Sequence, residues 1–311
     1  MASHDQTRAA VPGVEAAHPP GYARRQSGSG PLAILGALLL SVACAPIPPA
    51  LHGVSTPAAG RVPTGEAIVA GLSPDEVDAE FLRLKVAFAQ EVPRISAVTL
   101  EHDHDWIVGA LAVLAESMDS AKIEGAQLIL VVDRNKDVQE AVIMLVRPDA
   151  AWAIVGGTRV LTGQPGHRGY YVTPTGVFPQ TTDILDFRAE GACIENGIRA
   201  PGGDGVRVWD FGWQMATKGR WPDEERGVIR LLLRATDPDR LRARIGRPPS
   251  QGCVHIPAAL SLFMDLHGVL DRAYEKAALT DARLHALLRP DRTPTLLAGS
   301  MLVVIDSSVA R

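Results

Sequence analysis

The sequence is poor in cysteine, aromatic residues and lysine. Three cysteines in 311 residues are too few for the disulfide framework of a small secreted scaffold. Charged residues make up 21% and the formal net charge is -4, so no basic excess indicates a nucleic-acid partner. Five of the 31 basic residues are lysines, a bias that fits genome composition better than function. The apolar fraction of 46% is that of a globular protein, and the length allows one or two domains.

An apolar run near the N-terminus indicates export. Residues 32–45 form a run of 14, shorter than the roughly 20 residues of a membrane span but within the length of a secretory h-region. We therefore interpret residues 1–45 as a signal peptide. Cys44 follows Ser-Val-Ala, which resembles a lipoprotein cleavage box and predicts a lipid anchor at Cys44. Alternatively, Ala43-Cys-Ala45 fits cleavage by an ordinary signal peptidase, and Arg24-Arg25 permits twin-arginine export.

A linker and a helical segment follow. Residues 46–72 are rich in Pro, Gly, Ala and Thr, which predicts a flexible linker. The helical segment, residues 73–120, opens with a capping box of Ser73 and Glu76 and has an apolar stripe that Pro93 ends. A second helix is predicted over 105–118. The His and carboxylate residues at 101–105 suit a solvated helix start better than a metal site, and we expect no metal.

The remainder, residues 124–306, is predicted to be a mainly β domain, so the fold class is α+β. A hairpin connection is predicted at 133–137, a helix at 260–274 and a final strand at 296–305. Short β-rich runs separated by turn residues predict the other strands, at 127–132, 138–146, 152–160, 169–172, 206–211 and 228–233.

A cysteine in a glycine turn is the main candidate for chemistry. Ser250-Gln-Gly-Cys253 leads into a short β-like run that contains His255. A glycine before the cysteine lets the thiolate project and lets nearby amide N–H groups face a tetrahedral oxyanion. The pattern therefore favours acyl transfer, with Cys253 as the nucleophile and Ser250 and Gly252 shaping the turn. Ser250, Gln251 and Gly252 are candidate substrate-binding residues.

At this point the chain resembles the bacterial L,D-transpeptidase catalytic domain family. The family signature is a His, about 14 to 17 residues, and then Ser or Thr, a residue that is usually His or Lys, Gly and the nucleophilic Cys. The core Ser250–Cys253 matches it. Further matching segments, all between residues 126 and 306, are Val131-Val-Asp-Arg-Asn135, Thr162-Gly-Gln-Pro-Gly-His167, Thr173-Pro-Thr-Gly-Val-Phe178, Glu195-Asn-Gly197 and Trp209-Asp-Phe-Gly-Trp213.

The resemblance implies a β-sandwich-like catalytic domain that acts on peptidoglycan stem peptides in the cell envelope. In such enzymes the cysteine attacks the L,D bond before the terminal D-Ala of a tetrapeptide stem, and a thioester forms. An amine of another stem then resolves the thioester and makes a cross-link. No cofactor is implied. The expected location is periplasmic, with membrane contact only through a lipid anchor at Cys44.

Two positions depart from the family pattern. Arg234 stands where relatives have the base His, with the spacing to Ser250 kept, and Gln251 replaces a second residue that is often His. Arginine cannot accept a proton, although its charge can stabilise a thiolate. His255 is the candidate substitute base, because side chains two residues apart in a strand share a face. His167, in a glycine-rich turn, is a candidate residue of the substrate groove.

Two alternatives to an active enzyme stay open at this point. The first is a pseudoenzyme that binds peptidoglycan stems without efficient catalysis, because Arg234 replaces the base. The second is an envelope protein in which Cys193 and Cys253 form a structural disulfide.

Overall fold

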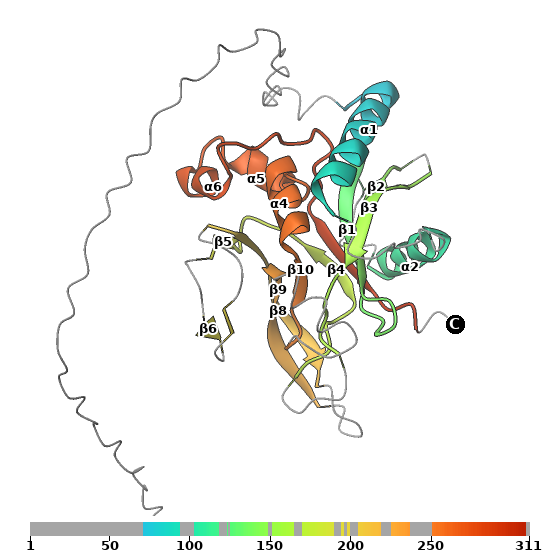
Figure 1. Cartoon of the computed structure of the whole chain (residues 1–311), viewed down its shortest axis with the longest axis vertical. Coiled ribbons are helices and arrows are strands. Elements are labelled where there is room, and N and C mark those ends of the chain that lie inside the picture. Colours follow the sequence, from blue (N-terminus) through green and yellow to red (C-terminus); the bar gives the residue numbers. More distant parts are fainter. Residues whose placement is uncertain are drawn as a thin grey trace, which may run out of the picture. The chain divides into compact units, whose positions relative to one another are not determined.

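The computed structural model (Figure 1) describes most of the chain from residue 71 onward. Backbone alone is described at 103–107, 116, 194–195 and 198–199. The described residues all belong to one compact unit, Pro57–Arg311. The predicted signal peptide with Cys44, and the linker up to residue 70, lie outside the described residues. The described residues are 71–93, 103–117, 123, 125–148, 151–164, 170–189, 194–195, 198–199, 205–218, 225–236 and 251–308.

A five-stranded sheet, in the order β3-β2-β1-β11-β4, is buried on both faces. Every residue of β1, β2 and β11 is buried, which explains their continuous apolar sequences. One face contributes to the largest cluster of buried hydrophobic residues, which we call the main core. Helix α2 (Asp103–Glu116) covers the other face through Ala110 and Leu114. β1 and β11 are parallel and the other pairs are antiparallel. The strands are β1 (Gln127–Asp133), β2 (Glu140–Val146), β3 (Ala153–Arg159), β4 (Gly176–Pro179) and β11 (Met301–Ile305).

A second sheet, in the order β10-β9-β8-β5, contributes to the same main core. β10 (Val254–Pro257) runs parallel to β9 (Arg226–Thr236), and β9 is antiparallel to β8 (Arg207–Thr217). The β8–β9 register shifts between Asp210 and Trp213. β5 (Phe187–Arg188) is at the edge, and β6 (Ile194–Glu195) and β7 (Ile198–Arg199) form a separate pair. The second sheet is therefore buried on the face that meets the first sheet.

Two helices complete the main core. The capping box predicted at Ser73 is present, and α1 (Pro74–Glu91) buries its apolar stripe against β3. Phe88 of α1 meets Phe263 of α4 (Ala258–His267) edge to face, with ring centroids 5.2 Å apart. Two short helices follow α4 in Figure 1, α5 (Arg272–Ala277) and α6 (Ala282–Leu287).

The structure confirms the α+β class and most of the predicted elements, with three corrections. The helix predicted at 260–274 is two helices, because Gly268 takes a left-handed conformation (φ 59°) that ends α4. The final strand covers 301–305 only. In the described part of 169–172, Tyr171 makes one isolated bridge to Lys218 in place of a strand. β8 and β9 extend well beyond the predicted runs, and the short strands β4, β5, β6 and β7 were not predicted.

Candidate functional site

Cys253 lies at the entry to β10, directly after a glycine turn. Gly252 has φ +112°, a conformation that only glycine adopts readily. The side chain of Cys253 is partly buried. Its Sγ–H donates to the backbone oxygen of Arg230 at 3.6 Å. The side chain of Cys253 is therefore held against the backbone of β9, and a nucleophilic role would require its thiolate form.

Two other segments hold the cysteine turn. Gly163 approaches so closely that a Cβ there would lie 2.8 Å from the Cα of Gly252 and 2.1 Å from the carbonyl oxygen of Tyr171. The hydroxyl of Thr173, which is fully buried, accepts from the Gly163 amide at 2.8 Å and donates to the Gly252 carbonyl at 3.0 Å. One side chain therefore satisfies a buried donor and a buried acceptor on both sides of the turn.

Arg134, directly after β1, connects a third segment to the residues that hold the cysteine turn. Its guanidinium donates to the carbonyl oxygen of Thr173 and pairs with Asp306 at 2.9 Å. Gln164 donates to the carbonyl oxygen of Arg134 at 2.6 Å. Burial of the Asp306 carboxyl opposes ionisation, but hydrogen bonds from Ser308 and Arg134 leave its pKa below the usual value. Three segments that the sequence places far apart thus converge on the turn that carries Cys253.

The residue at the expected base position lies beside His255. Arg234 and His255 are register partners in the parallel β9–β10 pair, so their side chains share a face. Arg234 Nε donates to His255 Nε2 at 3.3 Å. Val254 and Ile256, which alternate with His255, are fully buried in the core, so Cys253 and His255 lie together on the opposite face. The structure thus brings Cys253, His255 and Arg234 to one face of the second sheet.

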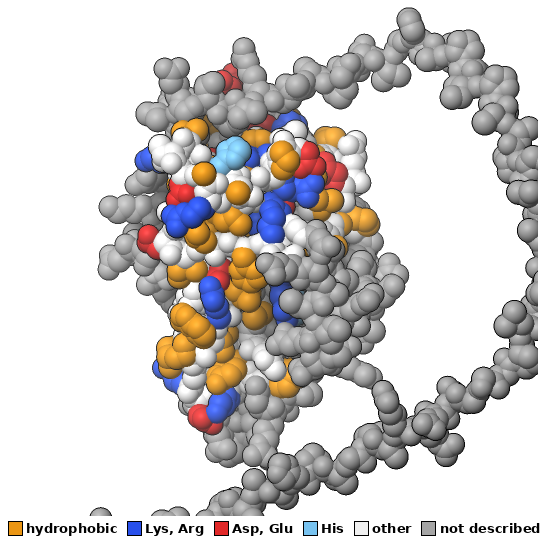
Figure 2. Space-filling view, turned by 90° about the vertical axis from the view of Figure 1, so that its left-hand side faces the viewer, with side chains coloured by type: hydrophobic (Ala, Val, Ile, Leu, Met, Phe, Trp, Pro, Cys, Tyr) orange, Lys and Arg blue, Asp and Glu red, His pale blue; other side chains and the backbone are white. Residues whose placement is uncertain are grey.

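The outer face of the β8–β9 hairpin extends away from this site. We define the hairpin face as Trp213, Met215 and Val228, three exposed apolar residues, with Trp213 67% exposed. Met215 is the register partner of Val228, and Trp213 is that of Arg230. In Figure 2, hydrophobic and Lys or Arg side chains alternate over the lower part of the face that is shown, at the height of β8 and β9. Exposed apolar groups gathered on one face suit a ligand-binding surface.

Arg230 joins the hairpin face to the buried part of β8. Its guanidinium pairs at 2.6 Å with Asp210, whose side chain is completely buried. Asp210 also accepts from the amide of Gly212, inside the register shift of β8. The carbonyl oxygen that binds the Cys253 thiol thus belongs to a residue fixed by an ion pair.

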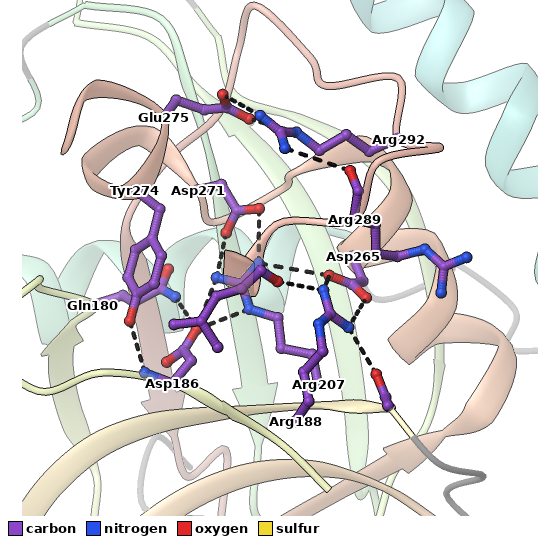
Figure 3. A network of polar contacts seen from close by, with 12 residues as sticks. Gln180, Asp186, Arg188, Arg207, Asp265, Asp271, Tyr274, Glu275, Arg289 and Arg292 are labelled. Atoms are coloured by element: carbon purple, nitrogen blue, oxygen red, sulfur yellow. Dashed lines mark hydrogen bonds and ion pairs between the residues drawn. The ribbon is translucent and has the colours of Figure 1, made fainter. Parts of the chain in front are cut away.

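A buried ionic network supports the sheet from the side of the C-terminal helices (Figure 3). Arg207 of β8 is fully buried and pairs with Asp186 and Asp271, each at 2.8 Å. The Tyr274 hydroxyl accepts from the amide of Asp186 at 2.7 Å, and burial raises the Tyr274 pKa. All these groups are enclosed, so the network is structural: it fixes β8 to the turn between α4 and α5.

The remaining predicted site residues are placed as follows. Gln251 is exposed at the start of the turn. Ser250, His167 and Cys193 lie outside the described residues. Thr173 and Arg134 were quoted in matching segments but given no role, and the structure shows that they hold the turn. No local sequence pattern indicates the role of Thr173 or of Arg134, because the partners of both residues are distant in sequence.

A cavity lies beside Arg134 and the segment that contains Thr173. Its volume is about 180 Å³. The cavity is lined by Arg134, Val172, Pro174, Thr175, Met215, Ala216, Thr217 and Arg226.

Within the described part of the chain, no three His, Cys, Asp or Glu side chains are grouped so as to hold a metal ion. No described helix is long and apolar enough to cross a membrane.

Comparison with known proteins adds a distant structural similarity. No family model and no curated protein matches the sequence. Among solved structures, the chain is similar to an L,D-transpeptidase from Mycobacterium smegmatis, with a TM-score of 0.26 and 14% identity. The match covers 58% of this chain and 59% of that one. The chain thus spans about three fifths of that protein's length, and the relationship is distant.

Proposed function

We propose that the protein is a cysteine acyltransferase of the L,D-transpeptidase type that acts on peptidoglycan stem peptides in the cell envelope. The observation that carries the proposal is the cysteine turn: Gly163 and Thr173 hold Gly252, and Cys253 follows at the start of β10, on the same face as His255 and Arg234. A turn fixed by such close contacts suits a positioned nucleophile. The Ser-x-Gly-Cys pattern of the sequence agrees with this role.

The reaction divides into two balanced steps. The thiolate of Cys253 attacks the carbonyl carbon of the L,D peptide bond, the C–S bond forms, and the tetrahedral oxyanion collapses as the C–N bond breaks. The proton lost from the thiol is taken up by the amine of D-Ala as it leaves. An acceptor amine then attacks the thioester, the C–S bond breaks as the new amide forms, and the proton lost by that amine goes to the departing sulfur, which restores the thiol. The amide energy is conserved in the thioester, so neither step needs a cofactor.

A second candidate function is favoured by the contact between Arg234 and His255. Arginine at the base position cannot take the thiol proton, and it occupies one ring nitrogen of the residue that would replace it. Loss of a general base costs about 100 to 10,000-fold in rate. A protein that binds stem peptides through the hairpin face without efficient turnover would have this arrangement.

The deciding experiment is the intact mass of the full chain after incubation with a carbapenem, and separately with a tetrapeptide stem. Carbapenems acylate the cysteine of the family. We expect a covalent adduct and release of D-Ala from the stem by the parent and by Cys193→Ala, and neither by Cys253→Ala. The Cys193 variant is the matched control, because it removes a thiol without touching the proposed nucleophile. Absence of both adduct and D-Ala from a folded parent would reject the enzyme and favour the stem-binding protein.

A further inference from the structure

We infer that Arg234 is a positioning residue that fixes His255 as the neutral tautomer with its proton on Nδ1, and so keeps His255 from acting as the base for Cys253. The inference deepens the proposed function and rests on it only for its kinetic consequence. It assigns a role to Arg234, which stands at the expected position of the base, and to its register partner His255.

The first step of the argument is the direction of one hydrogen bond. The guanidinium of Arg234 has donors and no acceptor, and it stays protonated in proteins. At 3.3 Å from Arg234 Nε, His255 Nε2 must therefore be the acceptor and carry no proton. A neutral imidazole has one N–H, so the proton is on Nδ1. The tautomer is assigned from this partner.

The second step is that the backbone leaves His255 little freedom to move away. Its amide donates to the carbonyl oxygen of Leu161 at 2.8 Å, and its carbonyl oxygen accepts from the Leu161 amide at 2.9 Å. On its other side, β10 pairs with β9, where Arg234 is the direct register partner. His255 thus lies between two backbone neighbours, with Arg234 on the same face.

The third step is chemical. A ring nitrogen accepts a proton only through a lone pair in the ring plane, and neutral His255 has one such lone pair, on Nε2. Arg234 occupies it, while Nδ1 in this tautomer already carries a proton and cannot accept another. His255 can take the thiol proton of Cys253 only after Arg234 leaves Nε2.

The test reads the tautomer directly, by two-bond ¹H–¹⁵N correlation NMR of the full chain labelled on histidine, at pH 7.5. The parent should show His255 protonated on Nδ1. Arg234→Met, which keeps bulk and removes every donor, should abolish this preference. Arg234→Lys should retain it, because an ammonium is also a donor only. Arg226→Met is the matched control on the same strand and should leave the tautomer unchanged. A parent His255 that is protonated on Nε2, or on both nitrogens, would overturn the inference.

A kinetic readout separates positioning from catalysis. Alkylation of Cys253 by iodoacetamide at pH 7.5 should change less than about threefold on His255→Gln, because His255 is not the base. A loss of tenfold or more would show that it is, and would overturn the inference. Neither measurement needs turnover of a stem peptide. A parent without carbapenem adduct but with the predicted tautomer would therefore count against the proposed function alone.

Discussion

At the scale of single residues, the hydroxyl of Thr173 joins two segments of the chain that meet only in the folded protein. It is 79 residues from Gly252 in sequence and contacts it directly. Its donor and acceptor are both used, by the Gly252 carbonyl and the Gly163 amide. Any residue without a hydroxyl leaves these two backbone groups without that partner, so the turn that presents Cys253 depends on one side chain.

Thr173→Val tests this dependence, because valine keeps the shape and removes the hydroxyl. We expect the free energy of unfolding to fall by about 1–3 kcal/mol, the cost of a buried polar group that loses its partner. Acylation of Cys253 by a carbapenem should also become slower, as the turn loosens. Urea titration and intact-mass kinetics measure the two effects.

Thr175→Val is the control for this prediction. Thr175 is exposed and lies two residues further along the same segment. Its replacement should change the free energy of unfolding by no more than about 0.5 kcal/mol. If both valine variants are as stable as the parent, Thr173 does not hold the turn.

At the scale of elements, the two strands of the long β8–β9 hairpin change from buried to exposed along their length. Near the register shift, Trp209 and Leu233 are buried in the main core, while further out the hairpin face is exposed. Trp213, Met215 and Val228 stay more than half exposed, so folding buries only part of their apolar surface. A partner that covers them would bury the rest, and the proposed partner is peptidoglycan.

Trp213→Ala is therefore expected to weaken binding to purified peptidoglycan sacculi by about tenfold. A large exposed aromatic residue that becomes buried in an interface typically contributes 1 kcal/mol or more. Co-sedimentation with sacculi over a range of protein concentrations measures the affinity. Leu279→Ala removes a comparably exposed residue, 66% accessible, beyond α5, and should bind as the parent does. Equal binding by both variants and the parent would remove the hairpin face from the stem-binding surface.

Elements were predictable where their signals were local. Ser73 and Glu76 are three residues apart, and the capping box they form was visible in the sequence. Gly252 and Cys253 are adjacent, so the turn could also be identified. The pairing of Arg234 with His255 was not predictable, because it needs the parallel register of β9 and β10. The same holds for Thr173, whose role depends on which segments fold against it.

At the scale of the whole molecule, the ionic network around Arg207 links three parts of the chain. Asp186 precedes β5, Arg207 opens β8, and Asp271 lies between α4 and α5. Asp186 also accepts from the side chain of Gln180 and from the amide of Asp210. Asp210 in turn holds Arg230, against which the Cys253 thiol rests. The enclosed charges are therefore connected through β8 to the candidate site.

This network makes the stability of the protein depend on pH in a direction that can be tested. Burial raises the pKa of Asp186 to about 6, although Arg207 acts in the opposite sense. The folded protein then binds more protons than the unfolded chain between about pH 4 and 6. The contribution of Asp186 to the free energy of unfolding is thus complete below about pH 4 and is lost as the pH rises through 6.

Asp186→Asn removes this titration and keeps one acceptor oxygen for Arg207. The stability advantage of the parent over the variant should therefore be larger at pH 4.5 than at pH 7, by on the order of 2 kcal/mol. Urea titrations of both proteins at the two pH values measure the difference. Asp281→Asn is the control, because Arg283 lowers the pKa of Asp281 to about 2, and its titration falls mostly below this range. An advantage of the parent over Asp186→Asn that grows toward pH 7 would mean that Arg207 outweighs burial, and that the network is stabilised by ionised Asp186.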